Sequence, residues 1–204
     1  STGSFRADAD GVLRTGDGRV LLGWPAAADG TIPAFPRDSA AGLEPVRLAT
    51  APVTAQPTTQ IALGVNLPAA QTRAGADGAA FDLPVQIFDA LGDTRALDIS
   101  FTPVVPVTGQ SNLWTLAITD RAAGGASLGS YEIAFADSGT AAASIASVST
   151  LSGPAFDAAQ GTIPLETSGG LLAIAIGRPG GGSSLTQFSS GFQAADVTRN
   201  GSPV

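Results

Sequence analysis

The 204-residue sequence contains no cysteine, histidine, lysine or methionine. Without cysteine, the chain has no disulfide framework, no thiolate nucleophile and no thiolate metal site. Without histidine, it lacks the commonest general base and the commonest transition-metal ligand, and no Ser-His-Asp triad can be built from this chain alone. Calcium and magnesium, which prefer oxygen ligands, are the only metals that the composition leaves open.

Positive charge is scarce as well, because ten arginines stand against 17 acidic residues and the formal net charge is -7. Neutralisation of phosphates by basic side chains supplies most of the affinity for nucleic acids, so we expect no nucleic-acid partner. Aromatic residues make up only 6% of the chain, which leaves no evident platform for stacking sugars. Hydrophobic residues, at 44%, suffice for a buried core and argue against wholesale disorder.

Long apolar runs are also missing. The longest, Leu171–Ile176, stops at Gly177, whereas a membrane helix needs about 20 apolar residues. We therefore expect no membrane partner, and we expect this run to be a buried strand. The chain begins at Ser1 without an initiator methionine and without a basic-then-apolar signal peptide, so we expect a fragment of a longer protein.

Turn residues and period-two alternation dominate what is present. The 26 glycines and 14 prolines are spread along the chain and separate short segments, as in an all-β protein with many turns. Alternating apolar residues predict strands at Ile61–Leu67, Phe81–Ile87, Leu97–Phe101, Trp114–Ile118, Tyr131–Phe135 and Leu172–Ile176. Helix signals are weak, and the run Thr140–Val148 fits a helix or a strand equally. The sequence therefore predicts an all-β fold built around a sandwich or a barrel.

The first 36 residues form a unit of their own. Short strand candidates occupy Phe5–Ala7, Val12–Arg14 and Val20–Leu22, and the turn sequences Asp8–Gly11 and Thr15–Gly18 lie between them. A proline-rich stretch then continues to Pro57, and such segments tend to be extended and semi-stiff. We expect a short N-terminal β-hairpin unit with its proline-rich connection in residues 1–57, and a β-sandwich or barrel-like domain in residues 58–204.

Two glycine-containing loops invite a ligand-binding interpretation. Asp8-Ala9-Asp10-Gly11 places alternating carboxylates in one loop, but an EF-hand counted from Asp8 needs a glutamate at its twelfth position, where this chain has Arg19. A plain hairpin turn is the favoured interpretation. Gly180–Ser184 follows an apolar strand, as a phosphate-binding loop would, but the lysine of a P-loop is absent, so we expect a flexible loop.

Asp89, Asp93 and Asp98 are close in sequence and could in principle supply the paired carboxylates of a glycosidase. They fall at turn and strand-face positions, where solvent-facing aspartate is the commoner case. Trp24 and Trp114 are interpreted as core or interface anchors. The sequence therefore predicts no catalytic residue, no cofactor-binding residue and no metal-binding residue, and hence neither an enzyme nor a cofactor.

Three segments of the sequence carry a recognisable pattern. The first comprises Gly3-Ser4-Phe5, Asp8-Ala9-Asp10-Gly11, Leu13, Gly18, Leu22-Gly23-Trp24-Pro25 and Gly30. The second comprises Phe88-Asp89-Ala90-Leu91-Gly92 with Leu97, Phe101 and Trp114, and the third comprises Leu185-Thr186-Gln187-Phe188-Ser189-Ser190-Gly191-Phe192 with Asn200-Gly201. The first segment resembles bacterial flagellar rod and hook proteins, and the other two resemble the outer domain of flagellar hook proteins. Arg95, near a frequent histidine, and Ser202, at a frequent aromatic position, depart from the pattern.

The resemblance implies a structural subunit of the flagellar hook, a curved tubular polymer that acts as a flexible joint and transmits torque. It implies self-association into a helical assembly, with flagellar rod, cap and hook–filament junction proteins as further partners. It also implies type III export without a cleaved signal peptide, and an extracellular location in the hook. Residues 1–57 would be the first half of the inner β-domain and its connection, and residues 58–204 the outer β-domain, with the family's terminal helices absent.

Three other functions stay open at this point. A distal rod protein shares the N-terminal pattern but generally lacks a large inserted outer domain. A carbohydrate-binding or adhesin β-module would show an exposed aromatic row or a bound calcium. A glycosidase would require two carboxylates that face each other across a cleft.

Overall fold

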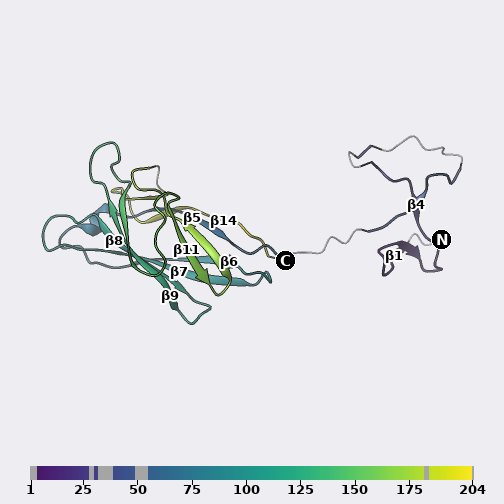
Figure 1. The fold of residues 1–204 in the computed structure, drawn as a ribbon, viewed down its shortest axis with the longest axis horizontal. Helices are drawn as coiled ribbons and strands as arrows, with labels where there is room; N and C mark the ends of the chain where they lie inside the picture. The colour runs from purple at the N-terminus through teal and green to yellow at the C-terminus, as the bar shows by residue number, and fades with distance from the viewer. Residues whose placement is uncertain (1–3, 28–29, 32–38, 49–54, 182–183, 204) are drawn as a thin grey trace. The chain divides into compact units, whose positions relative to one another are not determined.

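The computed structural model describes residues 4–27, 30–31, 39–48, 55–181 and 184–203. The chain divides into two compact units, Ser1–Val53 and Thr54–Val204, and the division falls within the proline-rich stretch of the sequence. Within the described ranges every regular element is a strand, apart from the short 3-10 helix η1 (Ala69–Thr72). The all-β prediction is confirmed (Figure 1). In the same part of the chain, no helix is long and apolar enough to cross a membrane.

The first unit contains two small antiparallel pairs. Strands β1 (Phe5–Ala7) and β2 (Leu13–Thr15) form a hairpin, and β3 (Leu22–Gly23) pairs with β4 (Glu44–Pro45). The predicted hairpin turn at Asp8–Gly11 is therefore confirmed. Among the described residues of this unit, Val12 is the one buried hydrophobic side chain. Two-stranded pairs of this kind are marginally stable by themselves.

The first sheet of the second unit is an antiparallel meander. Its strands are β6 (Phe81–Phe88), β7 (Thr94–Pro103), β8 (Leu113–Asp120), β9 (Ala126–Phe135) and β10 (Ile145–Ser152). They lie in the spatial order β10-β9-β8-β7-β6, so each strand pairs with its neighbours in sequence. Each connection is consequently a hairpin loop at one of the two ends of the sheet.

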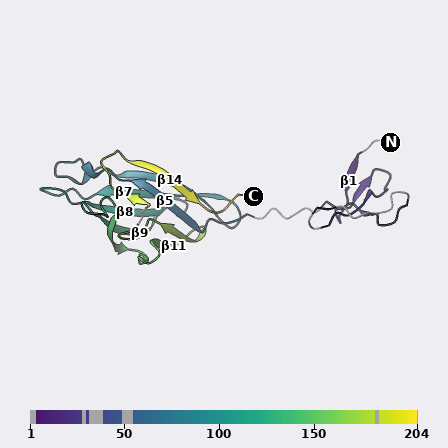
Figure 2. The same ribbon diagram turned by 90° about the horizontal axis from the view of Figure 1, so that it is seen from above.

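The second sheet is built around one central strand. Its strands are β5 (Gln60–Asn66), β11 (Thr162–Thr167), β12 (Gly170–Ala175), β13 (Leu185–Thr186) and β14 (Gln193–Arg199). β5 pairs in parallel with β12 and β13 along one edge. Along the other edge it pairs antiparallel with β14, which lies beside it in Figure 1 and Figure 2. The first and last strands of the unit are therefore direct neighbours.

Apolar side chains from both sheets form one core. The six alternating stretches predicted from the sequence all form strands, and Phe101, Trp114 and Tyr131 are the largest of their fully buried side chains. Each large side chain buried in this way stabilises the fold by about 1.5–3 kcal/mol relative to an exposed one. In the predicted strand that ends at Ile176, alternate residues are buried, but Leu171 is 72% exposed.

Four strands of the second unit were not predicted as such: β10, β11, β13 and β14. Thr140–Val148, left open between helix and strand, contains a turn up to Ser144 and then the start of β10 at Ile145, so the helical alternative is wrong. β10 and β14 are mostly exposed edge strands, and their sequences lack the period-two apolar alternation on which the prediction depended.

Candidate functional site: the neck of the second unit and its polar anchors

The second unit is closed where the chain enters and leaves it. We call residues 55–60 and 199–203 the neck. The backbone N–H of Gln56 donates to the carbonyl oxygen of Ser202 at 3.2 Å, and the N–H of Ser202 donates back to the carbonyl of Gln56 at 2.9 Å. The N–H of Asn200 donates to the carbonyl of Gln60 at 3.2 Å. The two crossing segments are thus held side by side.

The side chain of Asn200 adds a clasp across the neck. Its Oδ1 accepts hydrogen bonds from the backbone N–H groups of Thr59 at 2.8 Å and Gln60 at 2.9 Å. Its Nδ2 donates to the hydroxyl of Thr59 at 2.8 Å. Gly201 follows with a φ of 92°, and a Cβ at this position would lie 2.8 Å from the carbonyl oxygen of Gln56. Both residues of the Asn200-Gly201 pair are therefore required by the local geometry.

The neck is also tied to the first sheet at the end of β6. The N–H of Thr58 donates to the carbonyl of Phe88 at 2.9 Å, and the N–H of Phe88 donates to the Thr58 hydroxyl at 3.0 Å. The guanidinium of Arg199 lies over the Phe88 ring, 5.1 Å from its centroid, in a cation–π contact. Movement of the neck is thereby coupled to the end of the meander.

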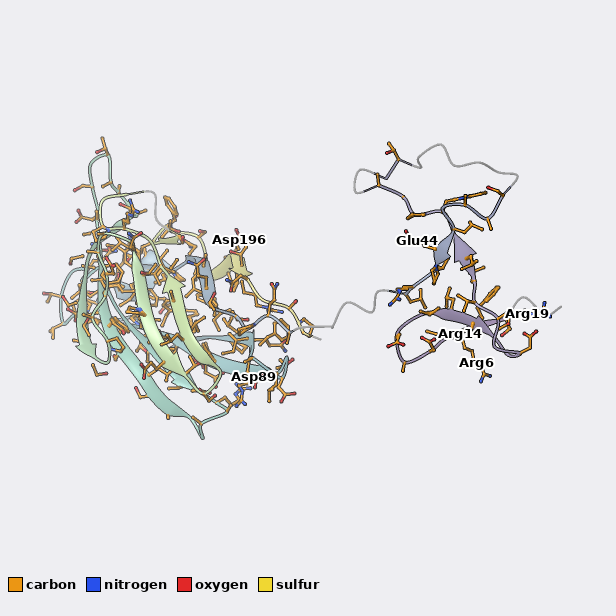
Figure 3. The ribbon with its side chains drawn as sticks, turned by 45° about the vertical axis from the view of Figure 1, so that its right-hand side comes forward. Arg6, Arg14, Arg19, Glu44, Asp89 and Asp196 are labelled. Carbon is orange, nitrogen blue, oxygen red and sulfur yellow. The ribbon has the colours of Figure 1, made fainter. Side chains whose placement is uncertain are left out.

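Asp89, next to this contact, is not the solvent-facing turn residue that the sequence predicted. It is 5% exposed, its Oδ1 accepts from the N–H groups of Leu91 and Asp93, and its Oδ2 accepts from Nε of Arg95 at 2.9 Å (Figure 3). The hydrogen bond from Arg95 lowers the pKa of the Asp89 carboxyl below its ordinary value. Burial is tolerated because the carboxylate is paired with a cation and accepts two turn N–H groups.

The other two carboxylates of that group have different surroundings. Asp93 is exposed in the turn, as predicted. Asp98 accepts from Nε of Arg121 at 2.9 Å. Asp89 and Asp98 each pair with a different arginine, so these side chains are engaged in separate ion pairs. This arrangement does not resemble two glycosidase carboxylates aimed at one bond.

Asp120, which sequence reasoning missed, links the two sheets. It is 1% exposed; its Oδ1 accepts from the N–H groups of Ala122 and Ala123, and its Oδ2 accepts from the N–H of Ser168 at 2.8 Å. Burial raises the pKa of Asp120, but the hydrogen bonds from Ser168 and the turn outweigh it, so the pKa lies below its ordinary value. The glycine-rich turn after Asp120 could have indicated that its carboxylate accepts from turn N–H groups. Nothing in the local sequence indicated the bond to Ser168.

The side chains of Trp114, Gln187 and Asn112 are linked in a row by hydrogen bonds. Its indole Nε1 donates to Oε1 of Gln187 at 3.1 Å, and Nε2 of Gln187 donates to Oδ1 of Asn112 at 2.8 Å. The Phe192 ring stacks on Phe81, with centroids 4.9 Å apart. Trp114 is thus a core anchor, as predicted, and it contacts the segment that supplied the third part of the sequence pattern.

Asn66, also missed, holds the same segment from β5. Its Oδ1 accepts from the N–H of Phe188 at 2.8 Å, and its Nδ2 donates to the carbonyl oxygens of Ser190 and Gly191 at 3.1 Å each. Residues far apart in the sequence pattern therefore meet in the fold, where they fix the loop between β13 and β14. The bond from Trp114 to Gln187 joins the two sheets, whereas Asn66 fixes a loop within the second sheet.

In the two loops that invited ligand-binding interpretations, Asp8–Gly11 and Gly180–Ser184, the polar groups described here bond within the chain. Asp8 accepts from the N–H groups of Asp10 and Val12, and its Oδ2 pairs with Nε of Arg14 at 2.6 Å (Figure 3). Over the described ranges, no three acidic side chains converge on a common point. Of the Gly180–Ser184 loop, residues 182–183 lie outside the described residues, and the N–H of Gly180 donates to a carbonyl of β10.

Two apolar surfaces are candidates for contacts with other molecules. In the second unit, a groove of about 660 Å³ is lined by Leu128, Pro154, Pro164 and Leu171, among others. In the first unit, large hydrophobic side chains are exposed: Phe5, Leu22, Trp24 and Leu48. Trp24 is therefore not a core residue of the unit as described. Exposed apolar surface of this kind marks contact sites in many proteins.

Comparison with known proteins gives a consistent result. Residues 49–202, about three quarters of the chain, match the family described as flagellar basal body protein FlaE D2 domain. The flagellar hook protein FlgE of Rhizobium meliloti (strain 1021) is 35% identical over 125 residues, which are 61% of this chain and 28% of that protein. The chain thus spans just over a quarter of the length of that curated relative.

Among solved structures, the flagellar hook protein FlgE2 of Helicobacter pylori is similar with a TM-score of 0.47 and 13% sequence identity, covering 98% of this chain and 73% of that one. The family match includes all ten strands of the second unit and both sides of its neck. It also confirms the resemblance that the sequence pattern indicated. The chain belongs to the FlaE D2 domain family of flagellar basal body proteins.

Proposed function

We propose that this chain is part of a structural subunit of the bacterial flagellar hook, in which many copies form a curved tube that bends while transmitting torque. The observation that carries the proposal is the match of residues 49–202 to the FlaE D2 domain, together with the hook protein among the relatives. The structure is compatible with a mechanical role, because buried Asp120 and Gln187 each take part in a hydrogen bond that joins one sheet to the other.

The proposal extends to the division of the chain. Residues 1–57 would be the first half of an inner β-domain with its connection, and residues 58–204 an outer β-domain inserted into it. Support comes from the neck, where Gln56 and Ser202 exchange two backbone hydrogen bonds, so the chain leaves the outer domain beside the point where it entered. An inserted domain needs this arrangement. Exposed Phe5, Leu22 and Trp24 in the first unit are the surface that a returning segment of the parent protein would cover.

The mechanical interpretation depends on the outer domain being rigid. Asp120 on β8 accepts from the loop between β11 and β12, and Trp114 on β8 donates to Gln187 just after β13, so the two sheets are joined and the outer domain moves as one body. In the proposed assembly, bending occurs through small sliding shifts between such bodies on neighbouring copies. Contacts that slide should be small, and interfaces below about 1,200 Å² are typical of weak association.

Location, export and partners belong to the same proposal. As a hook subunit, the parent protein would leave the cell through the flagellar type III pathway and lie outside it. Its contacts would be with further copies of itself and with flagellar rod, cap and hook–filament junction proteins. Its action is mechanical, with no enzymatic step and no cofactor.

Deletion of the parent gene in the source bacterium tests this function. We expect cells that assemble basal bodies but carry neither hooks nor filaments in electron micrographs, with recovery when the gene is supplied again. Truncated rods would contradict the proposal and indicate the distal rod alternative. Normal flagella with altered adhesion would contradict it in favour of a binding module.

A further inference from the structure

The neck contains the one Asn-Gly dipeptide of the sequence. The other asparagines, Asn66 and Asn112, are each followed by leucine. In an Asn-Gly pair, the backbone nitrogen of the glycine can attack the asparagine carboxamide with least hindrance, because glycine carries no side chain. Asn200 is exposed on the surface, so water reaches it. The fold has therefore placed its most reactive amide at the junction between the outer domain and the rest of the chain.

The local packing disfavours replacement of Asn200 or Gly201 by residues that would deamidate more slowly. Gly201 has a φ of 92°, and an added Cβ would lie 2.8 Å from the carbonyl oxygen of Gln56 and 2.9 Å from the backbone nitrogen of Thr58. Position 200 needs a side chain that both accepts and donates, because it accepts from two N–H groups and donates to the hydroxyl of Thr59. Asparagine meets both needs in one short side chain.

We propose that Asn200 is a site of spontaneous deamidation and that the closed neck controls its rate. The backbone nitrogen of Gly201 forms a bond to Cγ of Asn200, the bond from Cγ to Nδ2 breaks, and Nδ2 leaves as ammonia with the proton that the glycine nitrogen gives up. The resulting five-membered succinimide is then opened by one water molecule, which yields aspartate or its β-linked isomer, isoaspartate. No oxidant or further reactant is needed.

Control by the neck follows from the three hydrogen bonds on the carboxamide. For the attack, the Asn200 side chain must turn so that Cγ faces the nitrogen of Gly201, and this turn breaks its bonds to Thr59 and Gln60. The reaction therefore proceeds only during local opening. Three bonds of ordinary net strength slow it by roughly a hundredfold relative to an open chain.

Either product changes the neck. Aspartate still accepts from Thr59 and Gln60, but it adds one negative charge to a chain whose net charge is already -7. Isoaspartate inserts an extra methylene into the backbone before Gly201, which shifts Ser202 out of register with Gln56. The second product would loosen the junction permanently. This inference concerns the neck alone and does not depend on the polymer role.

The test compares the folded chain with the same chain unfolded in urea, both kept in mildly alkaline buffer. Trypsin cuts after Arg199, and the peptide that begins at Asn200 gains the mass difference between OH and NH₂ when Asn200 is converted. We expect conversion in the unfolded chain and a far slower rate in the folded chain. Aged folded protein that contains isoaspartate should melt at a lower temperature than fresh protein.

Two variants make the comparison specific. Thr59→Ala removes the hydroxyl to which Nδ2 donates, and we expect the folded-state rate to rise about fivefold. Thr198→Ala, a matched change on the adjoining strand β14, should leave the rate unchanged. Equal rates in folded and unfolded chains, or equal rates in the two variants, would overturn the control by the neck. Absence of conversion in the unfolded chain would overturn the site itself.

Discussion

Replacement of Asp120 is the sharpest test of how the two sheets are joined. In Asp120→Ala, the N–H groups of Ala122, Ala123 and Ser168 lose their acceptor. Each bond contributes about 1 kcal/mol net, and water reaches the turns in part, so we expect a loss of about 2–3 kcal/mol in the free energy of unfolding. For a domain of this size that corresponds to a melting temperature lower by about 5–10 °C.

Asp120→Asn removes the negative charge but keeps a side chain of the same shape, so it separates the contribution of the charge to stability from that of the hydrogen-bond geometry. The amide oxygen can still accept from the turn N–H groups, but its NH₂ group then faces the N–H of Ser168, so one bond is lost and the expected cost is about 1 kcal/mol. Asp82→Ala is the matched control, because Asp82 is exposed on β6 and its removal takes away the same charge. Urea unfolding followed by circular dichroism measures all three.

The pH dependence of these variants supplies an independent check. Because the pKa of Asp120 is lowered in the folded state, its contribution is present above the unfolded-state pKa of about 3.9 and is lost as the pH falls through the folded-state value. The stability difference between the wild type and Asp120→Ala should therefore be largest near neutral pH and shrink in acid. Equal stability losses for Asp120→Ala and Asp82→Ala, or a pH-independent difference, would refute the reasoning.

Three further changes have defined outcomes. Arg95→Ala removes the hydrogen bond that lowers the pKa of Asp89, so acid unfolding followed by fluorescence should begin at a higher pH than in the wild type. Gly201→Ala introduces strain at a positive φ and a close contact, and should cost about 1–3 kcal/mol in urea unfolding. Gly191→Ala, which meets nothing within 4 Å, should cost little. Millimolar calcium should leave the melting temperature unchanged, because the carboxylate of Asp8 in the Asp8–Gly11 loop is paired with Arg14. A bound ligand at a hundred times its dissociation constant would add about 2.7 kcal/mol to the free energy of unfolding, which a thermal melt would detect.

How far the sequence predicts the fold depends on whether a strand is half-buried. Strands such as β8, in which every second residue is buried, can be predicted from the alternation of apolar and polar residues in the sequence. The edge strand β14 has no buried residue and therefore no alternation to detect, although it pairs along most of β5. Its place in the fold comes from backbone pairing with β5, which does not require a particular pattern of apolar side chains.

The candidate site was harder to predict, because its contacts join distant loops. Asn200 and Thr59 are 141 residues apart, and Asp120 and Ser168 are 48 apart, so no local pattern reveals either pair. Asp89 was misjudged for a related reason: its turn sequence indicated exposure, whereas the arginine that pairs with it allows burial. Asn200-Gly201 was noticed as part of a family pattern, but its clasp across the neck is visible only in the structure.

Immunogold labelling of flagella from the source bacterium tests the central proposal most directly. Antibodies raised against residues 58–204 should place gold on the short curved segment between the filament and the cell envelope, because an outer domain faces solvent on the surface of the tube. Label on the filament alone, on the rod, or spread over the cell surface would contradict the assignment of this chain to the hook.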